Sequence, residues 1–394
     1  MAEDPDAPKL GVAQTVVLDG MEGVMVDVEC SVAGGVPFVK VVGLPDASIN
    51  ESCDRVRAAL ESNGIRWKSQ RTIFNLSPAH VRKRGTGCDL AMAAALLCGK
   101  GVLTQEQLTG TVLLGELGLD GRLHGVRGAL PSLLAAATHG ARRFVLPRDN
   151  RAEATIPLGD SVQMQVWCAD TLGDVLAFLR GDDNDLECVR PALAADYPPV
   201  PDLAEVRGQP LGRRALEIAA AGGHHLFFSG PPGAGKTMLA RRLPGILPPL
   251  SDEDALSVTS IHSLCGMVDP DHPLHRFAPF EAPHHSATAP SIVGGGSGIV
   301  RPGAASRAHR GVLFLDEASN GKCTSFSKEV TDEDDYEPAW RERAAGASDA
   351  GGGLPGVHSD GAGYAGRGHA GDLPVSAAVE VSQGQGGRDR ASAP

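Results

Sequence analysis

The chain has 394 residues, of which 42% are hydrophobic, so it is long enough for two or three domains with ordinary cores. Its 50 glycines and 28 prolines, with only 4% aromatic residues, indicate that part of the chain does not pack into a core. The net charge of −12 argues against a protein wrapped in nucleic acid over its whole surface, while a local basic groove stays compatible with it.

Three further features bound the class of protein. No window reaches the roughly 18–20 apolar residues of a membrane span. The acidic N-terminus, MAEDPDAPKL, lacks the basic and then apolar pattern of a secretion signal, so we expect a cytoplasmic protein with no membrane partner. The eight cysteines are scattered without a CxxC pair, which favours reduced, mostly buried thiols over a disulfide framework or a zinc site.

Residues 1–180 alternate between strand and helix patterns. Alternating apolar residues punctuated by glycine predict strands over 15–45, and an apolar stripe predicts a helix over 46–64. The elements expected after these are a strand at 71–77, a helix at 89–101, a hairpin at 111–126 that turns at Asp120 and Gly121, and a helix followed by a strand over 128–147. This mixture predicts one α+β domain over 1–180.

Residues 181–203 are rich in acidic residues and proline and have little periodicity, which predicts a linker. A second domain is expected over 204–318. It begins with a predicted helix at 213–223 and a strand at 224–230 that runs into a glycine-rich loop. Strand, glycine-rich loop and helix in this order are typical of the entry to an α/β P-loop fold.

The character of the chain changes at residue 319. Residues 319–394 contain long glycine-rich stretches and hardly any Leu, Ile or Phe. Such a composition buries too little apolar surface to offset the chain entropy lost on folding, so we predict a disordered low-complexity tail. The one weak strand candidate there is 374–382.

The segment GPPGAGKT at 230–237, called the phosphate loop below, matches GxxxxGK[ST] at every defined position. Its glycines let backbone N–H groups turn inward around phosphates, and a helix that begins near Lys236 adds the positive end of its dipole. We expect Lys236 to reach the β- and γ-phosphates of ATP and Thr237 to place its hydroxyl on Mg²⁺. The residues predicted to bind the nucleotide are Gly230, Pro231, Pro232, Gly233, Ala234, Gly235, Lys236, Thr237 and Met238.

The segment GVLFLDE at 311–317 is an apolar strand that ends in two carboxylates. Asp316 is predicted to hold Mg²⁺ through water, and Glu317 to polarise the attacking water, so Glu317 and Lys236 are the predicted catalytic residues. The alternative is a buried strand whose acids only reach solvent. The distance in sequence from Thr237 leaves room for an intervening strand and helix, which favours the functional interpretation.

Residues 278–310, between these motifs, contain a pair of adjacent histidines and a basic stretch. Adjacent residues such as His284 and His285 point to opposite sides in most backbones, and no third ligand is evident, which disfavours a metal site. A glycine-rich stretch followed by Arg301, Arg307 and Arg310 is typical of a loop or hairpin with a basic edge. We favour a solvated loop over contact with DNA or with the nucleotide of a neighbouring subunit.

Residues 10–318 resemble the magnesium-chelatase-like AAA+ ATPases of the YifB/ComM type. The likeness is carried by NLSPAHVRKRGTGCDLAMAAALL, GPPGAGKTMLARRLPGILPPL and RPGAASRAHRGVLFLDEA, among other stretches. The resemblance implies ATP and Mg²⁺ as cofactors, a homo-hexamer, and a role in DNA remodelling such as branch migration in natural transformation. A metal-chelatase ATPase subunit is the other relative to weigh, but it lacks a domain like residues 10–180 before its phosphate loop.

The same resemblance links the N-terminal domain to the proteolytic domain of Lon and to the ribosomal S5 superfamily. Those peptidases use a serine that a lysine amine activates. The matching loop here contains Thr86 and Cys88 but no serine, and the helix that should supply the lysine has none. We therefore expect a Lon-like fold without peptidase chemistry.

The resemblance ends after Ala318. The family continues with a strand that ends in a sensor asparagine, an arginine finger, a second sensor and a helical lid, and 319–394 resembles none of them. This change predicts a truncation or frameshift, and the alternative is a genuine divergent tail. We expect weak ATP binding and negligible hydrolysis. The alternative function is that of a non-catalytic remnant whose N-terminal domain binds a partner. We expect the strands before the phosphate loop and before Asp316 either to pair directly or to accept 374–382 between them.

Overall fold

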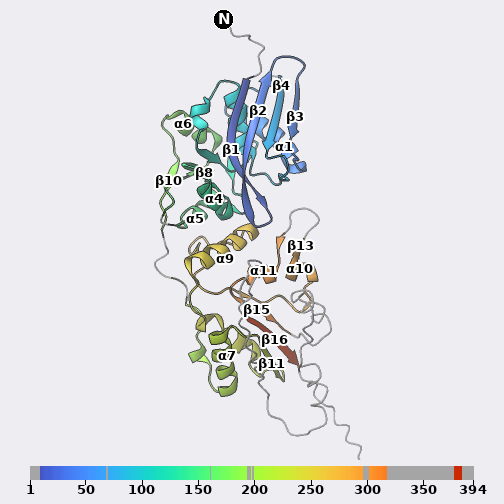
Figure 1. Ribbon diagram of the computed structural model, residues 1–394, viewed down its shortest axis with the longest axis vertical. Helices are drawn as coiled ribbons and strands as arrows, with labels where there is room; N and C mark the ends of the chain where they lie inside the picture. The colour runs from blue at the N-terminus through green and yellow to red at the C-terminus, as the bar shows by residue number, and fades with distance from the viewer. Residues whose placement is uncertain are drawn as a thin grey trace, which may run out of the picture. The chain divides into compact units, whose positions relative to one another are not determined.

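The computed structural model describes residues 9–67, 70–159, 161–192, 197, 199–295 and 301–316, and the backbone of a strand at 377–383. The chain forms two compact units (Figure 1). Unit 1 consists of the residues up to Tyr197 together with Thr259–Leu274, and unit 2 consists of Pro198–Val258 and the residues from His275 onward. Glu317 and the predicted tail, except for 377–383, lie outside the described residues.

Unit 1 is built on a mixed sheet, whose order among the described residues is β10-β9-β8-β5-β1-β2-β4-β3. Its strands are β1 (Lys9–Asp19), β2 (Glu22–Ala33), β3 (Phe38–Val42), β4 (Arg71–Ser77), β5 (Thr111–Leu113), β8 (Arg143–Pro147), β9 (Gln165–Ala169) and β10 (Glu187–Val189). β1 and β2 form a long antiparallel hairpin, while β1, β5, β8 and β9 are parallel neighbours. The predicted α+β domain thus contains a mixed sheet in which four strand pairs of the described residues are parallel and three are antiparallel.

The sheet of unit 1 has a hydrophobic core on each face. Its helices are α1 (Ala47–Ser62), α2 (Asp89–Gly99), α3 (Gln105–Leu108), α4 (Ala129–Thr138), α5 (Arg151–Ala154) and α6 (Leu172–Arg180), with a 3-10 turn at Arg148–Asn150. Successive side chains of a strand point to opposite faces of the sheet. In β5, Leu113 therefore packs in one core with α1, α2 and α6, whereas Val112 packs in the other core with α4. Every residue of α2 from Asp89 to Leu97 is buried, as expected for a small-residue helix against a sheet.

The local sequence signals locate several elements of unit 1. Asp46 caps α1 by accepting a hydrogen bond from the Ile49 amide at 3.0 Å, so the helix begins where the sequence predicts. The predicted turn at Asp120 and Gly121 is confirmed, because β6 (Glu116–Leu117) and β7 (Leu123–His124) pair antiparallel around Gly121, whose φ is +86°. The hairpin is shorter than predicted, since Thr111–Leu113 forms β5 of the main sheet.

Two parts of unit 1 were not predicted from local sequence patterns. Strand β10 lies inside the stretch predicted as a linker and pairs antiparallel with β9. The second half of helix α9 (Asp252–Cys265), from Thr259 onward, belongs to unit 1, where the Ser263 carbonyl accepts from the Gly128 amide at 3.1 Å. The boundaries at residues 180 and 203 stay predictions.

Unit 2 contains a parallel sheet in the order β11-β16-β15-β12. Its strands are β11 (Leu226–Gly230), β12 (Phe280–Glu281), β15 (Val312–Leu315) and β16 (Ala377–Gln383), and a separate hairpin joins β13 (Gly294–Gly295) to β14 (Arg301–Pro302). Its helices are α7 (Pro210–Gly222), α8 (Lys236–Ala240), the first half of α9, α10 (Ala289–Val293) and α11 (Ala304–Arg307), with 3-10 turns at Leu203–Glu205 and Pro244–Ile246. The core joins α7 and α8 to the sheet through Leu216, Leu239, Phe228 and Phe314.

Of the two arrangements expected for the sheet of unit 2, the structure has the one in which a strand from the tail lies between the strand before the phosphate loop and the strand before Asp316. β11 and β15 do not pair directly, because β16 lies between them and is parallel to both (Figure 1). The backbone N–H and C=O groups on the inner edges of β11 and β15 therefore pair with β16. Among the helices of the described residues, none is long and apolar enough to cross a membrane.

Candidate nucleotide-binding site

The phosphate loop connects β11 to α8. Leu226 and Phe228 of β11 are buried and fix the strand in the sheet, and the strand ends at Gly230, the first residue of the loop. Gly233 and Gly235 have φ of +81°, a backbone conformation that residues with a Cβ rarely adopt. The glycines of the motif are therefore needed by the turn itself.

The Lys236 side chain folds back across the phosphate loop. Its Nζ donates to the carbonyl oxygen of Gly230 at 2.7 Å and to that of Pro231 at 3.0 Å. Lys236 is also the first residue of α8, with Gly235 as the left-handed residue before the helix. An ammonium group held by neutral carbonyls at a helix N-terminus is an arrangement that suits an anionic ligand.

The remaining loop residues surround this turn. Thr237 lies in the first turn of α8, and its carbonyl accepts from the Arg241 amide at 3.1 Å. The Met238 side chain is 37% exposed and reaches back over the loop, with its Cε 3.3 Å from the position of a Cβ at Gly235. The structure thus brings together the whole predicted set from 230 to 238 as one strand, turn and helix start.

A residue that the sequence analysis missed, Gln209, also contacts the phosphate loop. Its Nε2 donates to the carbonyl oxygen of Ala234 at 3.0 Å. The helix that follows Gln209 packs against α8, where a Cβ at Gly212 would lie 2.7 Å from Leu239 Cδ1. The only sequence signal was its position directly before Pro210, the first residue of α7.

Asp316 follows directly after β15. The pairings Phe227↔Glu380 and Glu380↔Leu315 place Leu315, the last residue of β15, level with Phe227, the second residue of β11, and all three strands run in the same direction. Since the carboxyl ends of parallel strands meet at one sheet edge, Asp316 and the phosphate loop lie at the same edge, separated laterally by two strand spacings of about 4.8 Å each. The predicted partner Glu317 lies outside the described residues.

Two of the three arginines in residues 278–310, Arg307 and Arg310, are engaged in ion pairs. Arg307 Nη2 lies 2.9 Å from Glu281 Oε2, and only 23% of the arginine side chain is exposed. Arg310 Nε lies 2.8 Å from Asp254 Oδ1. The predicted hairpin is confirmed by β13 and β14, but the expectation of a solvated loop is wrong for Arg307, because Glu281 of β12 neutralises it.

The adjacent histidines lie side by side. The rings of His284 and His285 are 4.0 Å apart between centroids, and His284 Nδ1 lies 2.7 Å from Ser286 Oγ. Within the residues that the structure describes, no group of three or more His, Cys, Asp or Glu side chains is arranged to hold a metal ion.

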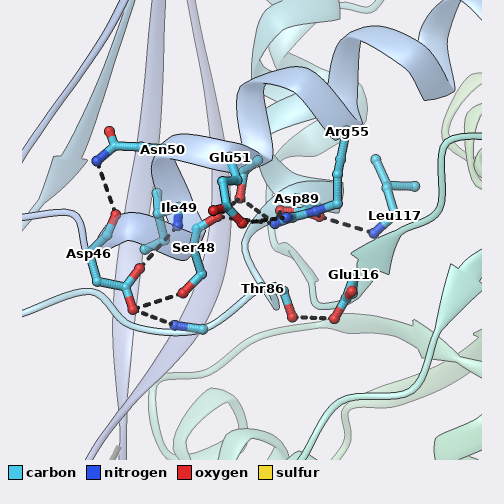
Figure 2. Close-up of polar contacts among 12 residues, drawn as sticks. Asp46, Ser48, Ile49, Asn50, Glu51, Arg55, Thr86, Asp89, Glu116 and Leu117 are labelled. Carbon is cyan, nitrogen blue, oxygen red and sulfur yellow. Dashed lines mark hydrogen bonds and ion pairs between the residues drawn. The ribbon is translucent and has the colours of Figure 1, made fainter. Parts of the chain in front are cut away.

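The loop that contains Thr86 lies in unit 1 (Figure 2). The Thr86 hydroxyl donates to the carboxylate of Glu116. Cys88 is 1% exposed, and burial raises the pKa of its thiol to about 12. Lys83 is buried, and its amine donates to the Pro78 carbonyl; burial lowers the pKa of this amine. A thiol with this pKa is not a nucleophile at neutral pH.

In unit 2, a glycine loop that joins a parallel strand to a helix, with a lysine as the first helical residue, defines the P-loop class of fold. Two family models match the chain. One, described as magnesium chelatase, subunit ChlI, matches residues 202–332, and the other, described as subunit ChlI of Mg-chelatase, matches residues 28–150.

Curated relatives match most of the chain. An uncharacterized protein of Mycobacterium tuberculosis is 48% identical over 312 residues, covering 79% of this chain and 61% of the relative. The uncharacterized protein YifB of Escherichia coli is 41% identical, covering 78% and 59%, and the competence protein ComM of Haemophilus influenzae is 39% identical, covering 76% and 58%. The chain belongs to the magnesium-chelatase-like family of the YifB and ComM type, and it spans about three-fifths of the length of these relatives.

A more distant similarity concerns the proteolytic family named in the sequence analysis. Lon protease 1 of Thermus thermophilus is 25% identical over 195 residues, which cover 47% of this chain and 24% of the relative. This similarity is compatible with the mixed α/β fold of unit 1. It does not indicate peptidase activity, because the Thr86 hydroxyl donates to Glu116 and the Cys88 thiol is buried with a raised pKa.

Proposed function

We propose that the chain binds ATP with Mg²⁺ at the phosphate loop. The observation that carries the proposal is the Lys236 ammonium, held across the loop by the Gly230 and Pro231 carbonyls at the start of α8. The backbone amides of Gly233 and Gly235, with Lys236, would bind the phosphates, and Thr237 and Asp316 would hold Mg²⁺, Asp316 through water. When bound, Mg²⁺ would offset the negative charge of the phosphates.

Hydrolysis is proposed to be slow in this chain. Glu317 is the residue assigned to polarise water, and Lys236 the residue assigned to the γ-phosphate. The central position of the sheet is taken by β16, from a stretch that does not resemble the sensor strand of the family. A strand other than the family's sensor strand between β11 and β15 would change how Asp316 faces the phosphate loop, and this would reduce turnover.

The wider role is proposed from the family. A relative carries the name competence protein, which is compatible with DNA remodelling by a cytoplasmic homo-hexamer. Both family models carry the name of a chelatase subunit, which keeps a metal-chelatase ATPase subunit as an alternative. The relatives named YifB and ComM match 78% and 76% of the chain, including its N-terminal part, and this favours the first role.

Nucleotide binding to the full-length chain tests the proposal. Equilibrium binding of fluorescent ATP with Mg²⁺ should be saturable and should weaken at least about tenfold in Lys236→Ala, because a charged hydrogen-bond donor is lost. Arg214→Ala is the matched control, since Arg214 lies on α7 in an exposed pair with Glu217 and should leave binding unchanged. No saturable binding, or equal binding by both variants, would contradict the site; turnover of about 1 s⁻¹ or more would contradict slow hydrolysis.

A second candidate is a non-catalytic protein in which unit 1 is a partner-binding module. Unit 1 favours this candidate because it has its own hydrophobic core on each face of its sheet. Limited proteolysis of the full chain should then leave a resistant N-terminal fragment that ends near residues 180–200. Uniform digestion would count against it.

A further inference from the structure

We infer that Gln209 is a positioning residue of the phosphate loop, and that its side chain fixes the direction in which the backbone amide of Gly235 points. The inference rests on the proposed binding of a nucleotide at residues 230–237. It assigns a function to a side chain that lies outside the phosphate-loop motif.

The contact itself is specific. Gln209 Nε2 donates to the carbonyl oxygen of Ala234, the residue between the two left-handed glycines of the loop, at 3.0 Å. Gln209 also begins α7, because its carbonyl oxygen accepts from the Arg213 amide at 2.9 Å. One residue thus connects the start of α7 to the middle of the phosphate loop.

The backbone at Gln209 is held in an unusual conformation. Its φ is +54° and its ψ is +47°, and the preceding Gly208 also has a positive φ of +71°. A residue with a Cβ seldom adopts this region, and the residue before a proline is normally extended. Such a conformation persists where the surrounding structure requires it, which is often at a functional site.

The geometry of the peptide bond converts this contact into an effect on phosphate binding. In a trans peptide the carbonyl oxygen and the amide hydrogen point in opposite directions. When Gln209 draws the Ala234 oxygen toward α7, the Gly235 N–H of the same peptide points away from α7. Within the described residues this N–H donates to no acceptor, so it is available to a phosphate oxygen.

The glycine that follows Ala234 makes an anchor necessary. Gly235 tolerates positive and negative φ at similar cost, so the peptide between Ala234 and Gly235 is easily flipped by rotation about ψ of Ala234 and φ of Gly235. A flipped peptide would turn the Ala234 oxygen toward the phosphates, where it would repel them, and would remove one donor. Gln209 opposes this flip from outside the loop, and the close packing of Gly212 on Leu239 holds α7 beside α8.

Gln209→Glu tests the inference in the full-length chain. The variant has nearly the same shape but cannot donate to the Ala234 oxygen, and its carboxylate repels that oxygen. We expect its affinity for a fluorescent ADP analogue to fall on the order of tenfold. Displacement of the analogue by inorganic tripolyphosphate should weaken by a similar factor, because the lost donor contacts phosphate. Glu217→Gln, on the exposed side of α7, is the control and should bind as the wild type does.

Thermal unfolding separates a positioning role from helix capping. We expect Gln209→Glu to unfold near the temperature of Glu217→Gln without nucleotide and to gain much less stability when ADP is added. An unchanged gain with a lower nucleotide-free midpoint would show capping alone and overturn the inference. If Gln209→Glu does not fold, Gln209→Ala replaces it, with weaker binding again expected. If the wild type binds the ADP analogue and neither Gln209 variant binds it more weakly, this inference is overturned and the proposed function stands. If the wild type does not bind the analogue, the proposed function is overturned as well.

Discussion

Asp89 and Arg55 form a bidentate ion pair inside unit 1 (Figure 2). Arg55 Nε lies 2.6 Å from Oδ2 of the aspartate, and Arg55 Nη2 lies 3.0 Å from Oδ1. The Asp89 side chain has no exposed surface, and burial raises its pKa, an effect that the hydrogen bonds from Arg55 oppose. The Leu117 amide also donates to Oδ2, at 3.1 Å, so one carboxylate joins α1, α2 and β6.

Removing this carboxylate should destabilise unit 1 strongly. Asp89→Ala leaves the largely buried guanidinium of Arg55 without its main partner, and we expect the free energy of unfolding to fall by about 3–5 kcal/mol. Glu51→Gln is the matched control, since Glu51 Oε2 lies 4.0 Å from Arg55 Nη1 and 73% of its side chain is exposed. It should change stability by less than about 0.5 kcal/mol. Urea unfolding followed by tryptophan fluorescence measures both, and similar losses would contradict the prediction.

Glu153 should make the stability of unit 1 depend on pH. Burial raises its pKa, although it accepts hydrogen bonds from the Ser263 hydroxyl, from Asn150 Nδ2 at 3.0 Å and from the Leu130 amide at 2.9 Å. A carboxyl with a raised pKa binds more protons in the folded state than in the unfolded state. Its contribution to stability is therefore complete below the pKa of the unfolded state and is lost as the pH rises through the pKa of the folded state.

The comparison with Glu153→Gln isolates this contribution. The variant does not titrate, so the free energy of unfolding of the wild type minus that of the variant should decrease as the pH rises from about 4 toward 8. Urea unfolding at several pH values gives the difference directly. A difference that grows with pH would mean that the pKa is lowered in the folded chain, and a constant difference would mean that it is not shifted.

Arg307 should act on the stability of unit 2 through Glu281. Arg307→Met leaves the mostly buried carboxylate of Glu281 without its partner at 2.9 Å, and we expect a loss of about 1–3 kcal/mol. Arg301→Met, at an exposed position of β14, should cost less than about 0.5 kcal/mol. Thermal unfolding compares the two variants. If Arg307→Met left stability unchanged and weakened DNA binding in a salt-dependent way, Arg307 would be a nucleic-acid contact instead.

The elements that local signals specify were predictable from the sequence. The cap at Asp46, the apolar alternation of β4 and the glycines of the phosphate loop each act within a few residues, and each element lies where its signal is. Contacts between distant parts of the chain were not predictable. Neither the pairing of Arg307 with Glu281 nor the contact of Gln209 with Ala234 leaves a pattern in the sequence, because each depends on the packing of elements 25 or more residues apart.

The cysteines of unit 1 should differ in reactivity by their surroundings. Burial raises the pKa of Cys88 to about 12, whereas Cys188, at the middle of β10, is exposed. At pH 8 only about one Cys88 thiol in ten thousand would be ionised, and it would still be covered by the packing of α2. Brief treatment of the native chain with iodoacetamide should therefore modify Cys188 and spare Cys88, as measured by peptide mass spectrometry. Modification of both in urea is the control for accessibility. Equal rates in the native chain would mean that the loop around Thr86 opens readily, and that Cys88 is available for chemistry after all.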